Sequence, residues 1–169
     1  MKMGEIILRP WRADDCERLA ILANNRAIWI NVKDRLPLPY GRADAEAWIA
    51  HCQGRSGEPT QFAIEAGGEL AGGIGFEGLE DINRLTAEIG YWIAEPFWGK
   101  GIATKALREA SRRAFAGFPF ERLQATVFEW NGASMRVLEK AGYRLEGRMR
   151  RSIVKDGQII DSLLYARLR

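Results

Sequence analysis

Hydrophobic and polar positions follow two rhythms along the chain, and together they predict both strands and helices. Alternating or short apolar runs predict strands at 5–9, 61–66, 70–76, 86–94 and 123–127. Apolar residues at helical spacing predict helices after Asp14, at 43–52, from Ile102 to about Ala114, and at 133–141. Asp14 is the predicted N-cap of the first helix, with Glu17 as its capping-box partner. Residues 29–41, which contain two prolines, are predicted to be a loop.

Two short turn sequences predict β-hairpins. Gly67-Gly68 separates the strands at 61–66 and 70–76, and Asp156-Gly157 separates strands predicted at 143–154 and 159–166. The order of elements is helices, an antiparallel meander, strand–helix–strand–helix, and a final hairpin. This order favours an α+β fold with one central mixed sheet. Because the 169 residues show no repeat, low-complexity tract or linker, we expect a single domain over 1–169.

Composition narrows the class of protein without naming a function. Hydrophobic residues make up 47% and charged residues 28% of the chain, as in ordinary soluble globular proteins. No apolar run approaches the roughly 20 residues that span a bilayer, and Met1–Pro10 lacks the apolar core of a signal peptide. Cys16 and Cys52 are too few for a disulfide framework or a zinc site. We therefore expect a cytoplasmic protein without a metal; a net charge of +3 does not indicate nucleic-acid binding.

The most informative stretch is Trp98-Gly99-Lys100-Gly101-Ile102-Ala103, where a predicted strand leads through a glycine loop into a helix. Such a turn directs several backbone N–H groups at one point, and the helix dipole adds partial positive charge there. Glycines let a ligand approach the backbone closely. The loop therefore has the properties of a pyrophosphate site, although the glycines alone are equally compatible with a tight strand-to-helix connection.

A second glycine pattern is a decoy. Gly73-Ile74-Gly75-Phe76-Glu77-Gly78 matches the dinucleotide-binding pattern G-x-G-x-x-G letter for letter. That motif requires a helix to open within it, whereas here it falls inside a predicted strand. We expect these glycines to mark a bulge or a close approach rather than a nicotinamide or flavin site.

With the glycine loop in view, the chain resembles the GNAT superfamily of acetyltransferases, and more closely its branch of Rim-type ribosomal-protein N-terminal acetyltransferases. The superfamily pattern Gln/Arg-x-x-Gly-x-Gly/Ala is matched at Gly101 and Ala103, with Trp98 in place of the polar first residue. Three further stretches resemble the branch in the right order. They are 36–49, Asn131 to Tyr143, and the final hairpin at 156–166.

The resemblance implies a GNAT-like α+β fold: a central mixed, mostly antiparallel sheet with splayed strands, flanked by helices. It also implies that acetyl-coenzyme A is the cosubstrate and that the enzyme is an acyltransferase. By the same resemblance, the arm of coenzyme A lies in a gap between the strands at 89–94 and 123–127. The residues implied to bind the cofactor as a whole are Ile93, Ala94, Trp98, Gly99, Lys100, Gly101, Ile102, Ala103, Thr104, Asn131 and Ser134.

The resemblance suggests two catalytic side chains. Glu88 stands where some members carry the general base, and acts there through a water; the alternative is a carboxylate that only holds the acceptor or is solvated. Many members use a tyrosine as the acid, but the matching position here is Leu138, and Ser134 is the branch's usual replacement. The alternative for Ser134 is a hydroxyl that only contacts the cofactor. The backbone N–H near Ile93 is the expected oxyanion donor.

The expected reaction is direct attack of a primary amine on acetyl-coenzyme A in a ternary complex, the acceptor being a protein N-terminus or a small molecule. A non-catalytic acetyl-coenzyme A sensor is the alternative, kept open by Leu138. The sequence does not identify the acceptor, and dimerisation, known in some members of the branch, stays open. Aromatic and acidic side chains suited to an ammonium are the predicted acceptor-binding residues: Trp29, Asn31, Glu77, Tyr91 and Trp130.

Overall fold

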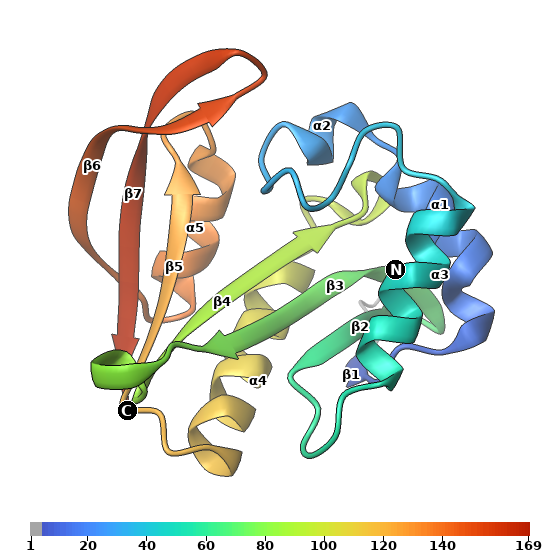
Figure 1. Cartoon of the computed structure of the whole chain (residues 1–169), viewed down its shortest axis with the longest axis horizontal. Coiled ribbons are helices and arrows are strands. Elements are labelled where there is room, and N and C mark those ends of the chain that lie inside the picture. Colours follow the sequence, from blue (N-terminus) through green and yellow to red (C-terminus); the bar gives the residue numbers. More distant parts are fainter. Residues whose placement is uncertain (1–4) are drawn as a thin grey trace.

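The computed structural model describes residues 5–169 (Figure 1). Residues 1–4, the start of the segment considered for a signal peptide, lie outside the described part. Within residues 5–169 the strands form one seven-stranded sheet in the order β1-β2-β3-β4-β5-β7-β6. All neighbouring pairs are antiparallel except β4 and β5, which are parallel. The strands are β1 (Ile6–Arg9), β2 (Gln61–Ala66), β3 (Glu69–Gly78), β4 (Thr86–Ile93), β5 (Arg122–Phe128), β6 (Arg144–Lys155) and β7 (Gln158–Leu168). The mixed, mostly antiparallel sheet predicted from the sequence is confirmed.

The helices are α1 (Cys16–Ala23), α2 (Arg26–Trp29), α3 (Arg42–Gln53), α4 (Ile102–Gly117) and α5 (Gly132–Lys140), with short 3₁₀ turns at Ala13–Asp15, Asp81–Asn83 and Glu95–Phe97. The predicted loop therefore begins one residue later than expected, because Trp29 closes the short helix α2. None of the helices within residues 5–169 is both long enough and apolar enough to cross a membrane.

The predicted N-cap at Asp14 is wrong. Asp15 precedes α1 instead, and its carboxylate accepts hydrogen bonds from the Arg12 backbone N–H and from both terminal nitrogens of Arg9. This buried ion pair joins β1 to the start of α1. A contact between separate elements has therefore taken precedence over the local capping-box pattern of Asp14 and Glu17.

Helices cover both faces of the sheet. One core cluster joins Ile74, Phe76 and Ile89 of the sheet to apolar residues of α4, and we call this side the α4 face. A second cluster joins Ala63 and Leu70 to apolar residues of α1 and α3 on the other side, the α3 face. Because successive strand residues point to opposite faces, each residue of β4 can be assigned to one of the two faces.

The sheet opens between β4 and β5. The two strands pair only at Thr86↔Arg122, Ala87↔Leu123 and Glu88↔Gln124. Beyond Glu88 they diverge toward their carboxyl ends, as Figure 1 shows for the yellow-green and orange arrows. This is the splay that the sequence resemblance implies, and it begins at Glu88.

The decoy glycine pattern lies in β3, as expected from its place in a strand. A Cβ at Gly73 would lie 2.8 Å from Trp92 Nε1, and one at Gly75 would collide with the Gln61 amide. The register of β2 and β3 also shifts opposite Ile64 and Glu65, which marks a bulge. Side-chain packing across the strands therefore explains these glycines.

Candidate active site

The glycine loop forms a cradle of backbone donors at the start of α4. Gly99 and Gly101 have φ values of +72° and +71°, which L side chains adopt only with strain. Gly101 is the N-cap of α4, and no side chain of the described residues caps this helix. The first N–H groups of the helix, from Ile102, Ala103 and Thr104, therefore face outward with the positive end of the helix dipole. The arrangement suits an anionic phosphate group.

The side chains of the loop are arranged around this cradle. Lys100 folds back, so that its Nζ donates to Pro96 O at 2.8 Å and lies 5.4 Å from the centre of the Phe97 ring. The indole Nε1 of Trp98 donates to Ile93 O at 2.6 Å. Trp98 thus links the loop to the end of β4, a contact that sequence reasoning did not anticipate.

The backbone of β4 presents groups to the open gap. Ala94 N–H donates to Ala71 O at 2.8 Å, and Ile93 stands opposite Gly72 in the register of β3. Opposite residues of an antiparallel pair alternate between bonded and non-bonded. The N–H groups of Tyr91 and Ile93 therefore point away from β3, toward the side that β5 has left. Ala94, predicted to bind the cofactor through its backbone, has its N–H committed to β3.

Tyr91 and Ser134 meet on the α4 face. Their hydroxyls are 2.7 Å apart, and burial raises the pKa of Tyr91 to about 12. Asn131 begins α5 as its N-cap, and its Oδ1 accepts from the Ser134 backbone N–H at 3.2 Å. Asn131 and Ser134, both predicted to bind the cofactor, therefore lie together, and Tyr91, predicted to bind the acceptor, joins them.

Glu88 lies on the α3 face, beside a second carboxylate. It stands directly opposite Glu77 in the β3–β4 register. Lys33, in the loop after α2, donates from Nζ to Glu88 Oε1 at 2.7 Å, and Arg35 lies 3.7 Å from Glu77. The predicted base is therefore already paired with a primary ammonium of the chain itself.

The segment from Arg26 to Arg35, which we call the strap, is attached to both halves of the sheet. Asn31 Oδ1 accepts from Trp130 Nε1 at 3.1 Å, which joins the strap to the connection between β5 and α5. Lys155 is 1% exposed; its Nζ donates to Asp34 at 2.6 Å and lies 3.8 Å from the centre of the Trp29 ring. Sequence reasoning missed Lys33 and Lys155, although Lys155 directly precedes the predicted hairpin turn.

The described residues thus bring together three groups of predicted site residues. Glu77 and Glu88 lie on the α3 face, Tyr91 and Ser134 lie on the α4 face, and Trp29, Asn31 and Trp130 belong to the strap contacts. The opening between β4 and β5 begins at Glu88 and separates the groups on the α3 face from those on the α4 face. In residues 5–169, no three His, Cys, Asp or Glu side chains gather in a way that could hold a metal ion.

Two curated proteins with related sequences are named as ribosomal acetyltransferases. A Bacillus subtilis protein provisionally named ribosomal N-acetyltransferase YdaF is 38% identical over 110 residues, covering 63% of this chain and 60% of that protein. The ribosomal-protein-serine acetyltransferase of Escherichia coli is 32% identical over 112 residues, 66% of this chain and 62% of its own length. The chain therefore spans about 60% of the length of these relatives.

The fold has solved counterparts as well. The structure of Mycobacterium smegmatis RimJ in complex with a coenzyme A disulfide superposes with a TM-score of 0.84 at 27% identity, covering 98% of this chain and 82% of that one. The family model described as acetyltransferase (GNAT) domain matches residues 5–144. The chain therefore belongs to the GNAT acetyltransferase family.

Proposed function

We propose that this protein is an N-acetyltransferase that moves the acetyl group of acetyl-coenzyme A to a primary amine by direct attack in a ternary complex. The observation that carries the proposal is the parting of β4 from β5 at Glu88, between a carboxylate on one face and paired hydroxyls on the other. The names of the ribosomal relatives and the coenzyme A compound bound to RimJ support the same reaction.

The glycine loop fits the phosphates of coenzyme A. The uncapped N-terminus of α4 and the positive φ of Gly101 leave room for a phosphate that a Cβ or a capping side chain would occupy. Lys100 and Thr104 border the same turn. Acetyl-coenzyme A supplies an acetyl thioester, whose carbonyl carbon is open to attack by an amine.

Backbone donors of β4 stabilise the charge that develops on the carbonyl oxygen. The free N–H groups of Tyr91 and Ile93 face the opening, and such donors contribute several kcal/mol in acyl-transfer sites. Tyr91 N–H lies three residues from Glu88, or about 10 Å along the strand, whereas Ile93 lies about 17 Å away. Glu88 therefore takes the amine proton through water rather than directly.

On the α4 face, the Ser134 hydroxyl assists departure of the coenzyme A thiolate, which needs a hydrogen bond or a proton. When Tyr91 donates its hydroxyl proton to Ser134 Oγ, the proton of Ser134 is free to point toward the opening. Because burial raises the pKa of Tyr91 to about 12, this hydroxyl keeps its proton at neutral pH. Ser134 thus hydrogen-bonds the thiolate as it forms, or passes it a proton that solvent then replaces on Ser134, and Tyr91 orients the serine hydroxyl.

The chemistry of the site favours an acceptor amine that is easy to deprotonate. An α-amine with a pKa near 8 is already partly neutral at pH 7.4, whereas a lysine side chain with a pKa near 10.4 loses about 4 kcal/mol to protonation. A site with Glu88, 34% exposed, as its one candidate base and a serine hydroxyl as its acid suits the amine that is easier to deprotonate. A protein N-terminal α-amine is therefore the favoured acceptor class, ahead of a lysine side chain.

The deciding experiment measures release of coenzyme A thiol from acetyl-coenzyme A across a panel of amines. The panel holds N-terminal peptides, including ribosomal ones, polyamines, amino acids and aminoglycosides. Turnover with one class, reduced at least tenfold by Glu88→Gln, supports the proposal. Bound acetyl-coenzyme A without turnover on any amine would instead support a non-catalytic sensor.

A further inference from the structure

Lys33 holds its amine at the carboxylate that is predicted to act as the base. Its Nζ donates to Glu88 Oε1 at 2.7 Å, and both side chains reach solvent. Among the lysines of residues 5–169, Lys33 alone donates to a predicted catalytic side chain, whereas Lys100 and Lys155 donate elsewhere. The chain thus presents a primary amine of its own where an acceptor amine would have to lie.

The backbone on both sides of Lys33 is held in place. Two residues before it, Asn31 Oδ1 accepts from Trp130 Nε1 at 3.1 Å. The next residue, Asp34, accepts from Lys155 Nζ at 2.6 Å, and Lys155 is 1% exposed. Both anchors lie on the far side of the opening between β4 and β5, whereas the ammonium of Lys33 lies against β4. The strap therefore holds this amine across the opening.

The Lys33 side chain can leave Glu88 while its backbone stays in place. An exposed ion pair of this kind is weak, and the four-carbon stem of a lysine is flexible. Proton transfer through one water requires the amine to withdraw by about 3 Å, the length of one hydrogen bond. Lys33 then occupies the position that the proposed function assigns to an acceptor amine.

The reaction at Lys33 is the proposed one, with the chain as its own acceptor. The neutral Nζ attacks the carbonyl carbon of the acetyl thioester, so that a C–N bond forms and the C–S bond breaks. Glu88 takes the amine proton through water, and the thiolate leaves with a hydrogen bond or a proton from Ser134. The products are Nζ-acetylated Lys33 and free coenzyme A.

Positioning offsets the unfavourable protonation of a lysine. An ordinary lysine side chain is neutral in about one molecule in a thousand at pH 7.4. A well-oriented intramolecular reaction has an effective molarity of about 10⁵ M or more, which exceeds this deficit. Lys33 is therefore a competent acceptor although a free lysine side chain is a poor one. The rarity of the neutral form makes the reaction slow beside turnover of an α-amine, so initial rates report the unmodified enzyme.

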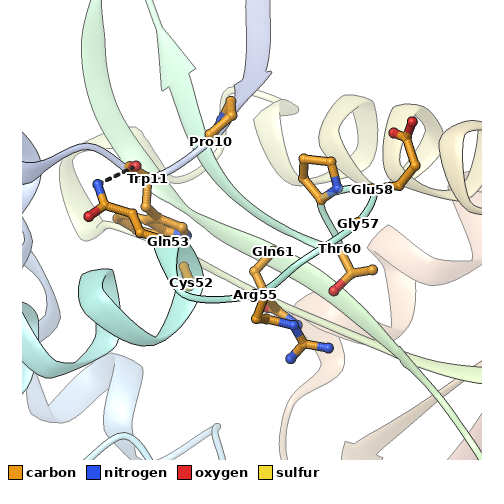
Figure 2. A pocket seen from close by; sticks show the side chains of 10 residues that line it. Pro10, Trp11, Cys52, Gln53, Arg55, Gly57, Glu58, Thr60 and Gln61 are labelled. Atoms are coloured by element: carbon orange, nitrogen blue, oxygen red, sulfur yellow. Dashed lines mark hydrogen bonds between the residues drawn. The ribbon is translucent and has the colours of Figure 1, made fainter.

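Other nucleophiles of the chain lie away from this reaction. Cys52 lines a cavity of about 210 Å³ at the C-terminal end of α3 (Figure 2), and neither Lys33 nor Glu88 is among the lining residues. Burial raises the pKa of the Cys52 thiol to about 11, so the reactive thiolate is scarce at pH 7. Lys140, the last residue of α5, is exposed to solvent and serves as an internal reference for uncatalysed acetylation.

We propose that Lys33 is a self-acetylation site, to which the enzyme transfers one acetyl group from its own bound acetyl-coenzyme A. The inference rests on the proposed function and adds a modification that changes the site. An acetylated lysine is neutral and no longer pairs with Glu88, so the carboxylate becomes available to an external amine. Acetylated enzyme should therefore show a KM for a cationic acceptor about two- to fivefold lower.

The test incubates the full chain with acetyl-coenzyme A and without an acceptor. Intact mass should rise by one acetyl group, peptide mass spectrometry should place this group on Lys33, and one equivalent of coenzyme A thiol should be released. The rate constant should not depend on protein concentration, because the reaction takes place within one molecule. Wild-type enzyme that has been incubated in this way should then show the lower KM.

Two variants provide the controls, and a thermal melt checks that each of them folds. Glu88→Gln should slow acetylation of Lys33 about tenfold or more and leave acetylation of Lys140 unchanged. Lys33→Arg keeps the positive charge but offers no lysine amine. It should release no equivalent of thiol, and its KM should be the same before and after the incubation.

Three results would overturn the inference. An unmodified Lys33 in enzyme that acetylates an external amine rejects self-acetylation and leaves the proposed function standing. Equal acetylation of Lys33 in wild type and Glu88→Gln rejects it as well, and so does a rate constant proportional to protein concentration. If no amine of the panel is turned over, the proposed function fails separately. Acetylation of Lys33 that depends on Glu88 then still supports the inference, and its absence rejects it.

Discussion

Lys33 occupies the carboxylate that an acceptor ammonium would be expected to meet. Its Nζ lies 2.7 Å from Glu88 Oε1, and the two side chains are 59% and 34% exposed. Exposed ion pairs of this kind contribute about 0.2–1 kcal/mol. An incoming ammonium must replace this contact, so the pair weakens acceptor binding by at most that amount. Converted to an equilibrium constant, 1 kcal/mol is a factor of about five.

Lys33→Ala should therefore lower the KM for a cationic acceptor about two- to fivefold and leave kcat nearly unchanged. The melting temperature should fall by no more than about 4 °C, because a chain of this size loses about 2–4 °C per kcal/mol. Lys33→Arg keeps the charge and serves as the matched control, with a KM close to that of the wild type. The assay is thiol release at varied acceptor and saturating acetyl-coenzyme A.

The reasoning is refuted by an unchanged or raised KM in Lys33→Ala, provided that Glu88→Gln still impairs turnover. A raised KM would mean that Lys33 helps to bind the acceptor, for instance by holding the strap closed. A loss of much more than 4 °C would mean that the pair stabilises the fold rather than competing with a ligand.

Three further changes probe the site and its support. Gly101→Glu should abolish binding of coenzyme A in titration calorimetry, since a side chain and a negative charge would enter the phosphate cradle; Gly117→Glu, at the exposed end of α4, should bind normally. Ser134→Ala should lower kcat more than it weakens cofactor affinity, and an unchanged kcat would reduce this residue to packing. Burial alone would raise the pKa of Asp15, but hydrogen bonds from Arg9 and from the Arg12 backbone outweigh it and hold this pKa below its ordinary value of 3.8. Its contribution to stability is therefore present above pH 3.8 and is lost as the pH falls through the lower folded value. Asp15→Asn should cost about 3 kcal/mol at pH 7, and thermal melts should show this deficit shrinking below pH 3.8.

The elements that sequence reasoning predicted well depend on local residue types. Asp156 and Gly157 have φ values of +51° and +72°, which a two-residue hairpin turn of this kind requires and which Asp-Gly readily adopts. The glycine loop can likewise be recognised from the sequence, because few residues other than glycine adopt the backbone angles found at Gly99 and Gly101. In the hairpin turn and in the glycine loop, the positive φ angles follow directly from the residue types at those positions.

The strap contacts could not be predicted in this way. Lys155 meets Asp34 across 121 residues of sequence, and Arg26 meets Asp156 across 130. No periodicity or spacing relates such partners, since the final hairpin and the strap come together only after the sheet has formed. The pairing of Tyr91 with Ser134 shows the same limit: each residue was singled out from the sequence, but for different roles.

Trp98 illustrates how a departure from a motif can be compensated elsewhere. The polar first residue of the superfamily pattern is absent, which at first implies one fewer contact near the phosphates. In the structure, however, the indole donates to Ile93 O, a carbonyl that shares the gap-facing side of β4 with the free N–H of Ile93. The carbonyl is thereby satisfied without a ligand, and the neighbouring donor is left available. A polar residue at this position would contact the phosphates. Trp98 instead hydrogen-bonds the end of β4, the strand that would bind the reacting end of the cofactor.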